Sequence, residues 1–166
     1  MARGWAWKLR VGDTGNTGFG LFATEPISAG ETVFIVEGEV MKDAYDDRYA
    51  VGPNWLSIAD RTWLDPFPEN PWTFVNHSCR PNCGLAGPVT VMAMRDIARG
   101  EEVTIDYSVT EADPHWSMEC HCGMPDCRRT IGSAHTLARD LFERYAPFMP
   151  PFLRSVYRSS GSAGGP

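Results

Sequence analysis

Short stretches of alternating apolar and polar residues recur along this chain of 166 residues. Alternation with a period of two is typical of strands that bury one face. Two of the stretches share the pattern I-x-x-G-E-x-V-x-I, which predicts a turn followed by a strongly β-prone strand. The alternating stretches and the two repeats occupy residues 5–11, 27–35, 55–58, 62–65, 89–94 and 97–105. Short strands at such close intervals predict a mostly β fold.

One amphipathic helix is predicted near the C-terminus, at residues 134–145, where four bulky side chains share one face. These four are Leu137, Leu141, Phe142 and Tyr145. Ser133 is the expected N-cap, and the prolines at 147, 150 and 151 are expected to end the helix. From residue 159 onward the Gly/Ser/Ala-rich sequence predicts a disordered tail.

Composition favours one globular domain without a membrane segment. A hydrophobic content of 43% is too high for a disordered chain, and no apolar run approaches the roughly 20 residues that span a bilayer. The N-terminus also lacks the apolar region of a signal peptide. We therefore expect a soluble, intracellular protein without membrane association, cytoplasmic if its source is prokaryotic.

The net charge of −6 argues against direct nucleic-acid binding, which usually relies on a basic surface. An acidic surface suits a basic protein or peptide partner. Taken alone, however, the charge indicates no more than solubility.

A glycine-rich segment follows the first predicted strand, with Gly12, Gly15, Gly18 and Gly20 leading into another apolar stretch. Glycines allow a positive φ angle and a close approach of the backbone to a ligand. The spacing is not the dinucleotide fingerprint, and a strand rather than a helix is expected next. A plain hairpin turn is an equally good interpretation at this point.

The densest group of polar side chains lies at Asn76–Cys83, directly after the apolar pair Phe74-Val75. Polar groups beside buried residues must be hydrogen-bonded, bound to a ligand or exposed, because burying them unpaired costs several kcal/mol. Pro81 fixes one φ angle and favours an extended Arg80, so we expect a defined loop here.

Three cysteines form a second cluster, C-x-C-x4-C, at Cys120, Cys122 and Cys127. Three thiolates so close together suit structural zinc, which takes four Cys or His ligands. The spacing is not the C-x-x-C of redox proteins, so a redox role is less favoured. The candidates for a fourth ligand are Cys79, Cys83, His77, His115 and His121.

A carboxylate and a phenol directly follow the second repeat, where residues 101–107 read E-E-V-T-I-D-Y. Ile105 and Tyr107 share one face of the strand, and Asp106 points to the other. Taken alone, a tyrosine at the end of a strand is typical of packing at the core or its rim.

Four motifs in this order resemble the SET-domain protein lysine methyltransferases and their post-SET zinc knuckle. They are G-F-G-L-F-A (18–23), N-H-S-C-x-P-N (76–82), G-E-E-V-T-I-D-Y (100–107) and C-x-C-x4-C (120–127). The resemblance implies small curved β-sheets with a pseudoknot, in which Asn76–Cys83 threads through a loop made by the later strand. It implies a SET domain at 5–110 and a post-SET knuckle at 111–131. Together with the helix and tail predicted above, this gives a helical extension at 132–158 and a disordered tail at 159–166.

The resemblance also implies roles for particular residues. S-adenosyl-L-methionine would bind against Gly18, Phe19, Gly20, Asn76 and His77, with Trp116 covering its adenine. Tyr107 would be the active-site tyrosine, and Tyr49, in an insert at residues 40–54, a second tyrosine of the substrate channel. One zinc ion would be held by Cys79, Cys120, Cys122 and Cys127, which leaves Cys83 as core packing.

Elementary chemistry agrees with the implied reaction, methyl transfer to a lysine amine of a basic protein or peptide. In-line displacement at a sulfonium needs alignment and a neutral amine, and a free lysine titrates near 10.4. An apolar channel beside a positive sulfonium lowers that pKa. A non-catalytic SET-fold module that binds a basic peptide is the alternative. A nucleophilic pair of His77 and Cys79 is disfavoured, because residues two apart in a loop rarely face each other.

The sequence departs from the family pattern at two positions. Thr73 stands where an arginine usually precedes the Phe-x-Asn-His segment, so one supporting polar contact is expected to be missing. Ile105 stands where the family commonly has Phe or Tyr. A tyrosine there tends to limit methylation to one group, so Ile105 indicates room for more.

Overall fold

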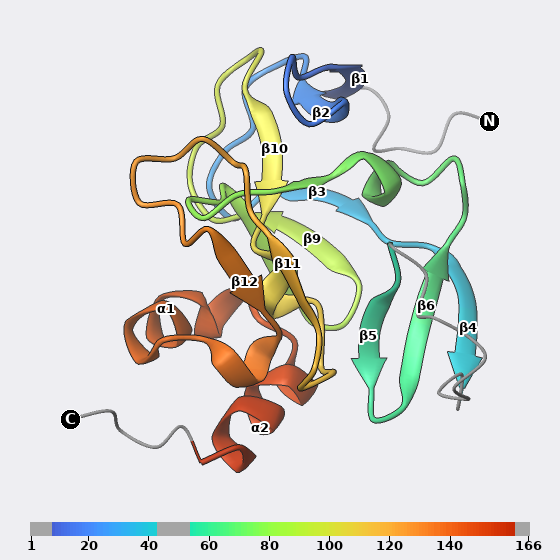
Figure 1. Ribbon diagram of the computed structural model, residues 1–166. Coiled ribbons are helices and arrows are strands. Elements are labelled where there is room, and N and C mark those ends of the chain that lie inside the picture. The colour runs from blue at the N-terminus through green and yellow to red at the C-terminus, as the bar shows by residue number, and fades with distance from the viewer. Residues whose placement is uncertain (1–7, 43–53, 162–166) are drawn as a thin grey trace.

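The computed structural model describes residues 8–42 and 54–161 of the chain. In these residues short strands form four small sheets, and two C-terminal helices cover one side of the core (Figure 1). The predicted mostly β fold is confirmed. No helix in the described ranges has the length and apolar character needed to cross a membrane.

The first sheet carries most of the candidate site. Its strand order is β1–β2–β10–β7, with β10 antiparallel to β2 and parallel to β7. The strands are β1 (Leu9–Asp13), β2 (Phe19–Ala23), β7 (Asn76–His77) and β10 (Glu102–Ile105). The late strand β10 therefore lies between two earlier segments, which is the crossed connection expected of the pseudoknot.

The buried amide of Asn82 extends this sheet beyond the short strand β7. Its Oδ1 accepts a hydrogen bond from the backbone N–H of Thr104 (2.9 Å), and its Nδ2 donates to the carbonyl of Glu102 (2.7 Å). Nδ2 also donates to the carboxylate of Glu101 (3.1 Å). One side chain thus supplies β10 with the pair of bonds that a neighbouring strand would make.

The other sheets complete the β part of the fold. Two have three strands, in the orders β3–β9–β8 and β4–β6–β5, and one pairs β11 with β12. Their bounds are β3 (Thr32–Ile35), β4 (Gly38–Lys42), β5 (Leu56–Ala59), β6 (Thr62–Pro66), β8 (Cys83–Ala86), β9 (Thr90–Ala93), β11 (Ser117–Glu119) and β12 (Thr130–Gly132). The strands predicted near 55, 62 and 89 are confirmed, whereas residues 43–53, with Tyr49, lie outside the described part.

The two copies of the sequence repeat contact each other directly. Ile27 and Ile97, the first residues of the copies, exchange backbone hydrogen bonds of 3.0 and 2.9 Å in an antiparallel bridge. Both copies turn at a glycine with positive φ, +80° at Gly30 and +83° at Gly100. The repeat is therefore a turn-then-strand unit used twice, as predicted, and both units enclose the same core.

The C-terminal segment differs from the prediction. Its helical elements are η4 (Ala134–Thr136), α1 (Arg139–Tyr145), η5 (Ala146–Phe148) and α2 (Pro151–Ser159). The single helix expected at 134–145 is wrong in its first half, because Leu137 is extended and α1 begins only after Ala138. Ser133 is buried and makes no capping hydrogen bond, so it is not the predicted N-cap of α1.

Sequence reasoning also missed the second helix. Pro151, expected to end a helix, occupies the first turn of α2, where a proline costs no hydrogen bond. The two helices pack through Phe142 and Tyr157, whose rings stack with centroids 3.8 Å apart. Both rings belong to the same core cluster as Leu21 and Val103 of the first sheet. The proposed division of the chain into domains remains a prediction.

We predict that Asn82→Ala lowers the free energy of unfolding by about 2–4 kcal/mol, because buried groups of β10 lose their partners. Urea denaturation measures this change. Asn16→Ala, at an exposed position of the glycine-rich turn, is the control and should change stability by less than about 0.5 kcal/mol. Equal effects of the two substitutions would contradict the structural role of Asn82.

Candidate functional site: a cavity beside a thiol cluster

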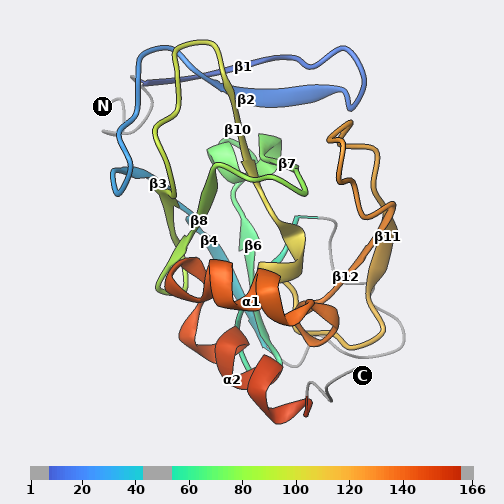
Figure 2. The same ribbon diagram turned by 90° about the vertical axis from the view of Figure 1, so that its left-hand side faces the viewer.

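The glycine-rich segment is the turn of the β1–β2 hairpin. The backbone N–H of Thr14 donates to the carbonyl of Gly18 (2.8 Å). Gly18 has a φ of +85°, which residues other than glycine rarely adopt. In Figure 2 this turn extends beyond the sheet towards the cysteine-rich loop between β11 and β12. The hairpin interpretation is correct, and the turn also forms one wall of a cavity.

The cavity has a volume of about 210 Å³ and lies between segments that are distant in sequence. Its walls come from the glycine-rich turn, from β7 with the loop after it, from β10, and from the cysteine-rich loop. The lining includes Asn16, Thr17, Asn76, His77, Glu102, Thr104, Cys122 and Met124. Of the cofactor residues implied by the sequence, Asn76 and His77 line it directly.

The other implied cofactor residues lie around this cavity in different ways. The carbonyl of Phe19 accepts a hydrogen bond from Nδ2 of Asn76 (3.0 Å), which brings residues 18–20 against the cavity wall. The Phe19 side chain is 66% exposed. Trp116 does not line the cavity and packs instead against the cluster of Cys79, Cys120 and Ile131. Its contact with an adenine stays a prediction.

Tyr107 is held at the end of β10 by its hydroxyl, which donates to the carbonyl of Val75 (2.6 Å). Its ring lies 5.4 Å from the ring of His77. Burial, and then the negative charge of Glu102, raise the pKa of Tyr107 to about 12. The phenol therefore stays protonated at neutral pH and can donate a hydrogen bond, but it cannot serve as a base.

His77 connects the tyrosine to the thiol cluster. Its Nδ1 accepts a hydrogen bond from the backbone N–H of Tyr107 (3.2 Å), and its Nε2 lies 3.4 Å from Sγ of Cys79. Burial lowers the pKa of His77 to about 4, so the ring is neutral. Because Nδ1 accepts a hydrogen bond, the single ring proton is on Nε2 and points at the sulfur.

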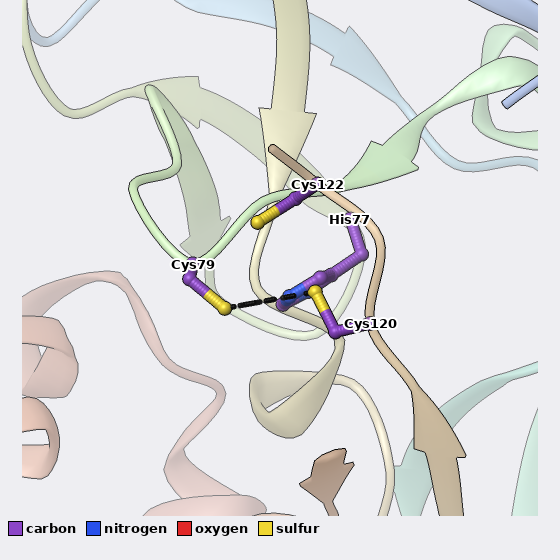
Figure 3. Close-up of side chains that lie close together, drawn as sticks. All are labelled: His77, Cys79, Cys120 and Cys122. Atoms are coloured by element: carbon purple, nitrogen blue, oxygen red, sulfur yellow. Dashed lines mark hydrogen bonds between the residues drawn. The ribbon is translucent and has the colours of Figure 1, made fainter. Parts of the chain in front are cut away.

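Four side chains converge in the group that Figure 3 shows, and two of them, His77 and Cys122, line the cavity. Potential ligand atoms of His77, Cys79, Cys120 and Cys122 all lie within 4.8 Å of one another. Cys127 adjoins this group, with its Sγ 3.3 Å from the carbonyl oxygen of Cys120. Three thiols and an imidazole at this spacing are compatible with a structural zinc ion.

The remaining candidates for a fourth ligand are not part of this group. The side chain of His121 is 76% exposed, and His115 is also exposed. Cys83 is buried in the main core, which raises the pKa of its thiol to about 12.

Within the group, the thiol of Cys122 has a lowered pKa. Burial raises this pKa, but hydrogen bonds from the backbone of Cys79 and Met124 and from neighbouring thiols lower it to about 7 overall.

Sequence reasoning missed Arg128, which joins the thiol cluster to the end of β10. Its Nη2 lies 2.7 Å from both carboxylate oxygens of Asp106, a residue that is 1% exposed. Its backbone N–H and Nε also lie 3.4 and 3.5 Å from Sγ of Cys79. Asp106 in turn caps the short helix η3 (Tyr107–Val109) through the N–H of Ser108. The only clue in the sequence is an arginine directly after the last cysteine of the cluster.

Comparison with known proteins identifies relatives of this chain. The SET domain family matches residues 18–108. The histone-lysine N-methyltransferase set1 of Dictyostelium discoideum is 36% identical over 129 residues, which are 68% of this chain and 8% of that protein. The histone-lysine N-methyltransferase ATX2 of Arabidopsis thaliana is 29% identical over 149 residues, 80% of this chain and 14% of that protein. The chain thus spans less than a fifth of these curated relatives.

Solved structures show the same similarity at the level of the fold. The crystal structure of KRYPTONITE in complex with mCHG DNA and SAH has a TM-score of 0.57 and 27% identity, covering 74% of this chain and 28% of that chain. A second KRYPTONITE structure, which also contains an H3(1-15) peptide, has a TM-score of 0.57 and 26% identity, covering 74% and 29%.

We predict that Arg128→Ala lowers the free energy of unfolding by about 3–5 kcal/mol, because it leaves the buried carboxylate of Asp106 unpaired. The matched control is Arg139→Ala. Arg139 is also 2.9 Å from a carboxylate, that of Glu143, but both side chains are exposed, so its loss should cost less than about 0.5 kcal/mol. Chemical denaturation of both variants makes the comparison, and similar losses would argue against a structural role for Arg128.

Proposed function

Because this chain belongs to the SET-domain family, we propose that it transfers methyl groups from S-adenosyl-L-methionine to a lysine side-chain amine of a protein. The relatives named as histone-lysine N-methyltransferases and the KRYPTONITE structures containing SAH support this proposal. The observation that carries it is the fixed position of the Tyr107 hydroxyl, 2.6 Å from the carbonyl of Val75 and next to the ring of His77.

The cavity between the glycine-rich turn and the thiol cluster suits the cofactor. Backbone groups of residues 18–20 and the side chains of Asn76 and His77 would hold it there. When bound, S-adenosyl-L-methionine supplies an electrophilic methyl group on a positively charged sulfur. The neutral His77 fits beside this positive charge, because its low pKa avoids a second cation at the cavity wall.

Tyr107 would orient the reacting groups without exchanging protons. Its hydroxyl remains protonated, so the target amine must lose its proton through burial in the channel and repulsion by the sulfonium. The phenol and the carbonyl of Val75 offer polar atoms that can align the amine and the methyl group. Alignment is the main requirement of this displacement, which agrees with the lack of a strong base in the arrangement.

We assign the zinc ligands to Cys79, Cys120, Cys122 and Cys127. His77 lies in the compact group of four, but its Nε2 carries the proton that points at Cys79 and has no lone pair free for a metal. Cys127 is the remaining thiol next to the group. The metal would cross-link the loop after β7 to the cysteine-rich loop between β11 and β12. Its role would be structural, and it would take no part in the methyl transfer.

The substrate we propose is a lysine in a basic protein or peptide, which the net charge of −6 would attract. Ile105 stands at the motif position where a tyrosine tends to limit methylation to one group. We therefore propose that the products carry more than one methyl group. Direct nucleic-acid binding is not part of the proposal, although KRYPTONITE was crystallised with DNA. We also propose an intracellular location, since the five cysteines form no disulfide and such cysteines are typical of reducing compartments.

We predict that Tyr107→Phe slows methyl transfer at least about 100-fold while cofactor affinity stays within about threefold, since only alignment is lost. The assay follows labelled methyl groups from the cofactor into basic proteins such as histones. Tyr145→Phe is the control, because the Tyr145 hydroxyl has no hydrogen-bond partner among the described residues. A wild-type protein that binds the cofactor but labels no lysine would favour the non-catalytic alternative.

For the metal, we predict one zinc ion per chain, lost in both Cys122→Ser and Cys127→Ser because each removes one of four thiolates. Elemental analysis of the purified variants measures the zinc content. Cys83→Ser and His77→Gln should keep the ion. If His77→Gln loses zinc and Cys127→Ser retains it, the ligand set includes the imidazole instead.

A further inference from the structure

Glu102 is a carboxylate of the cavity wall whose role is not explained by the motifs. It opens β10 and lines the cavity, where its Oε1 accepts a hydrogen bond of 2.7 Å from Nδ2 of Asn76. Among the described residues it has no cationic partner, unlike the neighbouring Glu101, which pairs with Arg95. Its hydrogen bond to Asn76 therefore links it to the residue expected to touch the cofactor.

This contact determines how the Asn76 amide is oriented. Nδ2 donates one proton to Glu102 and the other to the carbonyl of Phe19 (3.0 Å), so both of its protons are bound by acceptors of the protein. A flipped amide would place Oδ1 against these same two acceptors, which is unfavourable. The Oδ1 of Asn76 is thus left to accept a hydrogen bond from a ligand.

The second glycine of the G-F-G motif makes this arrangement sterically possible. A Cβ atom built on Gly20 would lie 2.4 Å from Oε1 of Glu102 and 2.6 Å from Cγ2 of Thr14. Real Cβ atoms do not approach other atoms so closely, so the flexible carboxylate would have to move. Gly18 differs, because a Cβ there would meet open space and only its φ of +85° calls for glycine.

We propose that Glu102 is a positioning residue for cofactor binding. Its carboxylate fixes the Asn76 amide so that Oδ1 accepts a hydrogen bond from the bound cofactor, and Gly20 lacks a side chain to leave room for that carboxylate. The missing side chain of this second glycine therefore serves the protein's own glutamate. This inference rests on the proposed function, because it assumes that the cavity binds S-adenosyl-L-methionine.

The first test measures affinity for the non-reacting product S-adenosylhomocysteine by calorimetry. Glu102→Ala should weaken binding about tenfold, the effect of losing one hydrogen bond to a charged group. Glu102→Gln keeps an acceptor for Asn76 and should stay within about threefold of wild type. The side-chain amide resonances of Asn76, followed by NMR without ligand, should shift in Glu102→Ala.

A double-mutant cycle then tests the role of Gly20. All variants carry Thr14→Ser, which removes the nearby methyl group and keeps the hydroxyl that bonds to Gly18. Gly20→Ala should weaken binding about tenfold, as Glu102→Ala does, because both displace the same carboxylate. In the double variant, Gly20→Ala should lower the affinity for S-adenosylhomocysteine by less than about twofold beyond the loss that Glu102→Ala causes alone.

The outcomes separate this inference from the proposed function. If wild type binds neither S-adenosylmethionine nor its product, both are overturned. If wild type binds and Glu102→Ala binds equally well, the role of Glu102 is refuted and the proposed function stands. Additive losses in the cycle, about 100-fold in the double variant, would show that Gly20 acts independently of the carboxylate.

Discussion

The side chain of Asn82 completes one edge of β10, and much of the molecule depends on that edge. The strand has four residues and is paired with β2 on one side, while β7 offers only two residues on the other. The bonds from Asn82 to the backbone of residues 102 and 104 extend the second edge. An extended edge holds Glu102 and Thr104 against the cavity and directs the chain into η3, where Tyr107 begins the turn. The strand β10 thus forms part of the cavity wall and leads directly to Tyr107. Asp106, directly after β10, binds Arg128 at the end of the cysteine-rich loop.

Electrostatics link the thiol cluster to the same strand. Burial disfavours the charge of Arg128, but Asp106 and Cys79 outweigh it and raise the pKa of the guanidinium, which remains cationic. Arg128 therefore balances the buried carboxylate and lies beside the sulfur of Cys79. Burial raises the pKa of the Cys79 thiol, and the neighbouring cation of Arg128 opposes this rise, so that a thiolate is less costly to bury here. The ion pair places Cys79, a proposed metal ligand, and the cap of the Tyr107 turn in one rigid unit.

Local patterns predicted the strands well and the tertiary contacts poorly. The repeats at residues 27 and 97 were recognisable because glycine is required at the same turn position in both. Arg128 and Glu102 could not be assigned roles, since their partners lie 22 and 26 residues away in sequence and depend on the crossed topology. The helix prediction failed at Leu137 for a related reason: this residue is buried in the core in an extended conformation, so packing decides its backbone. The thiol cluster was predictable as chemistry, whereas the position of His77 beside it needed the fold.

The insertion of β10 between β2 and β7 also restricts the order in which the chain can fold. β2 and β7 are made before β10. Until residues 102–105 arrive, β2 is paired only with β1, and β7 has no partner strand in this sheet. The bridge between Ile27 and Ile97 also joins positions that are far apart along the chain. Contacts of such long sequence separation slow folding, because the entropy of loop closure is lost before the contacts form. During synthesis the early strands would expose an unpaired edge until β10 closes the sheet, and such an edge is a template for wrong pairing with other chains.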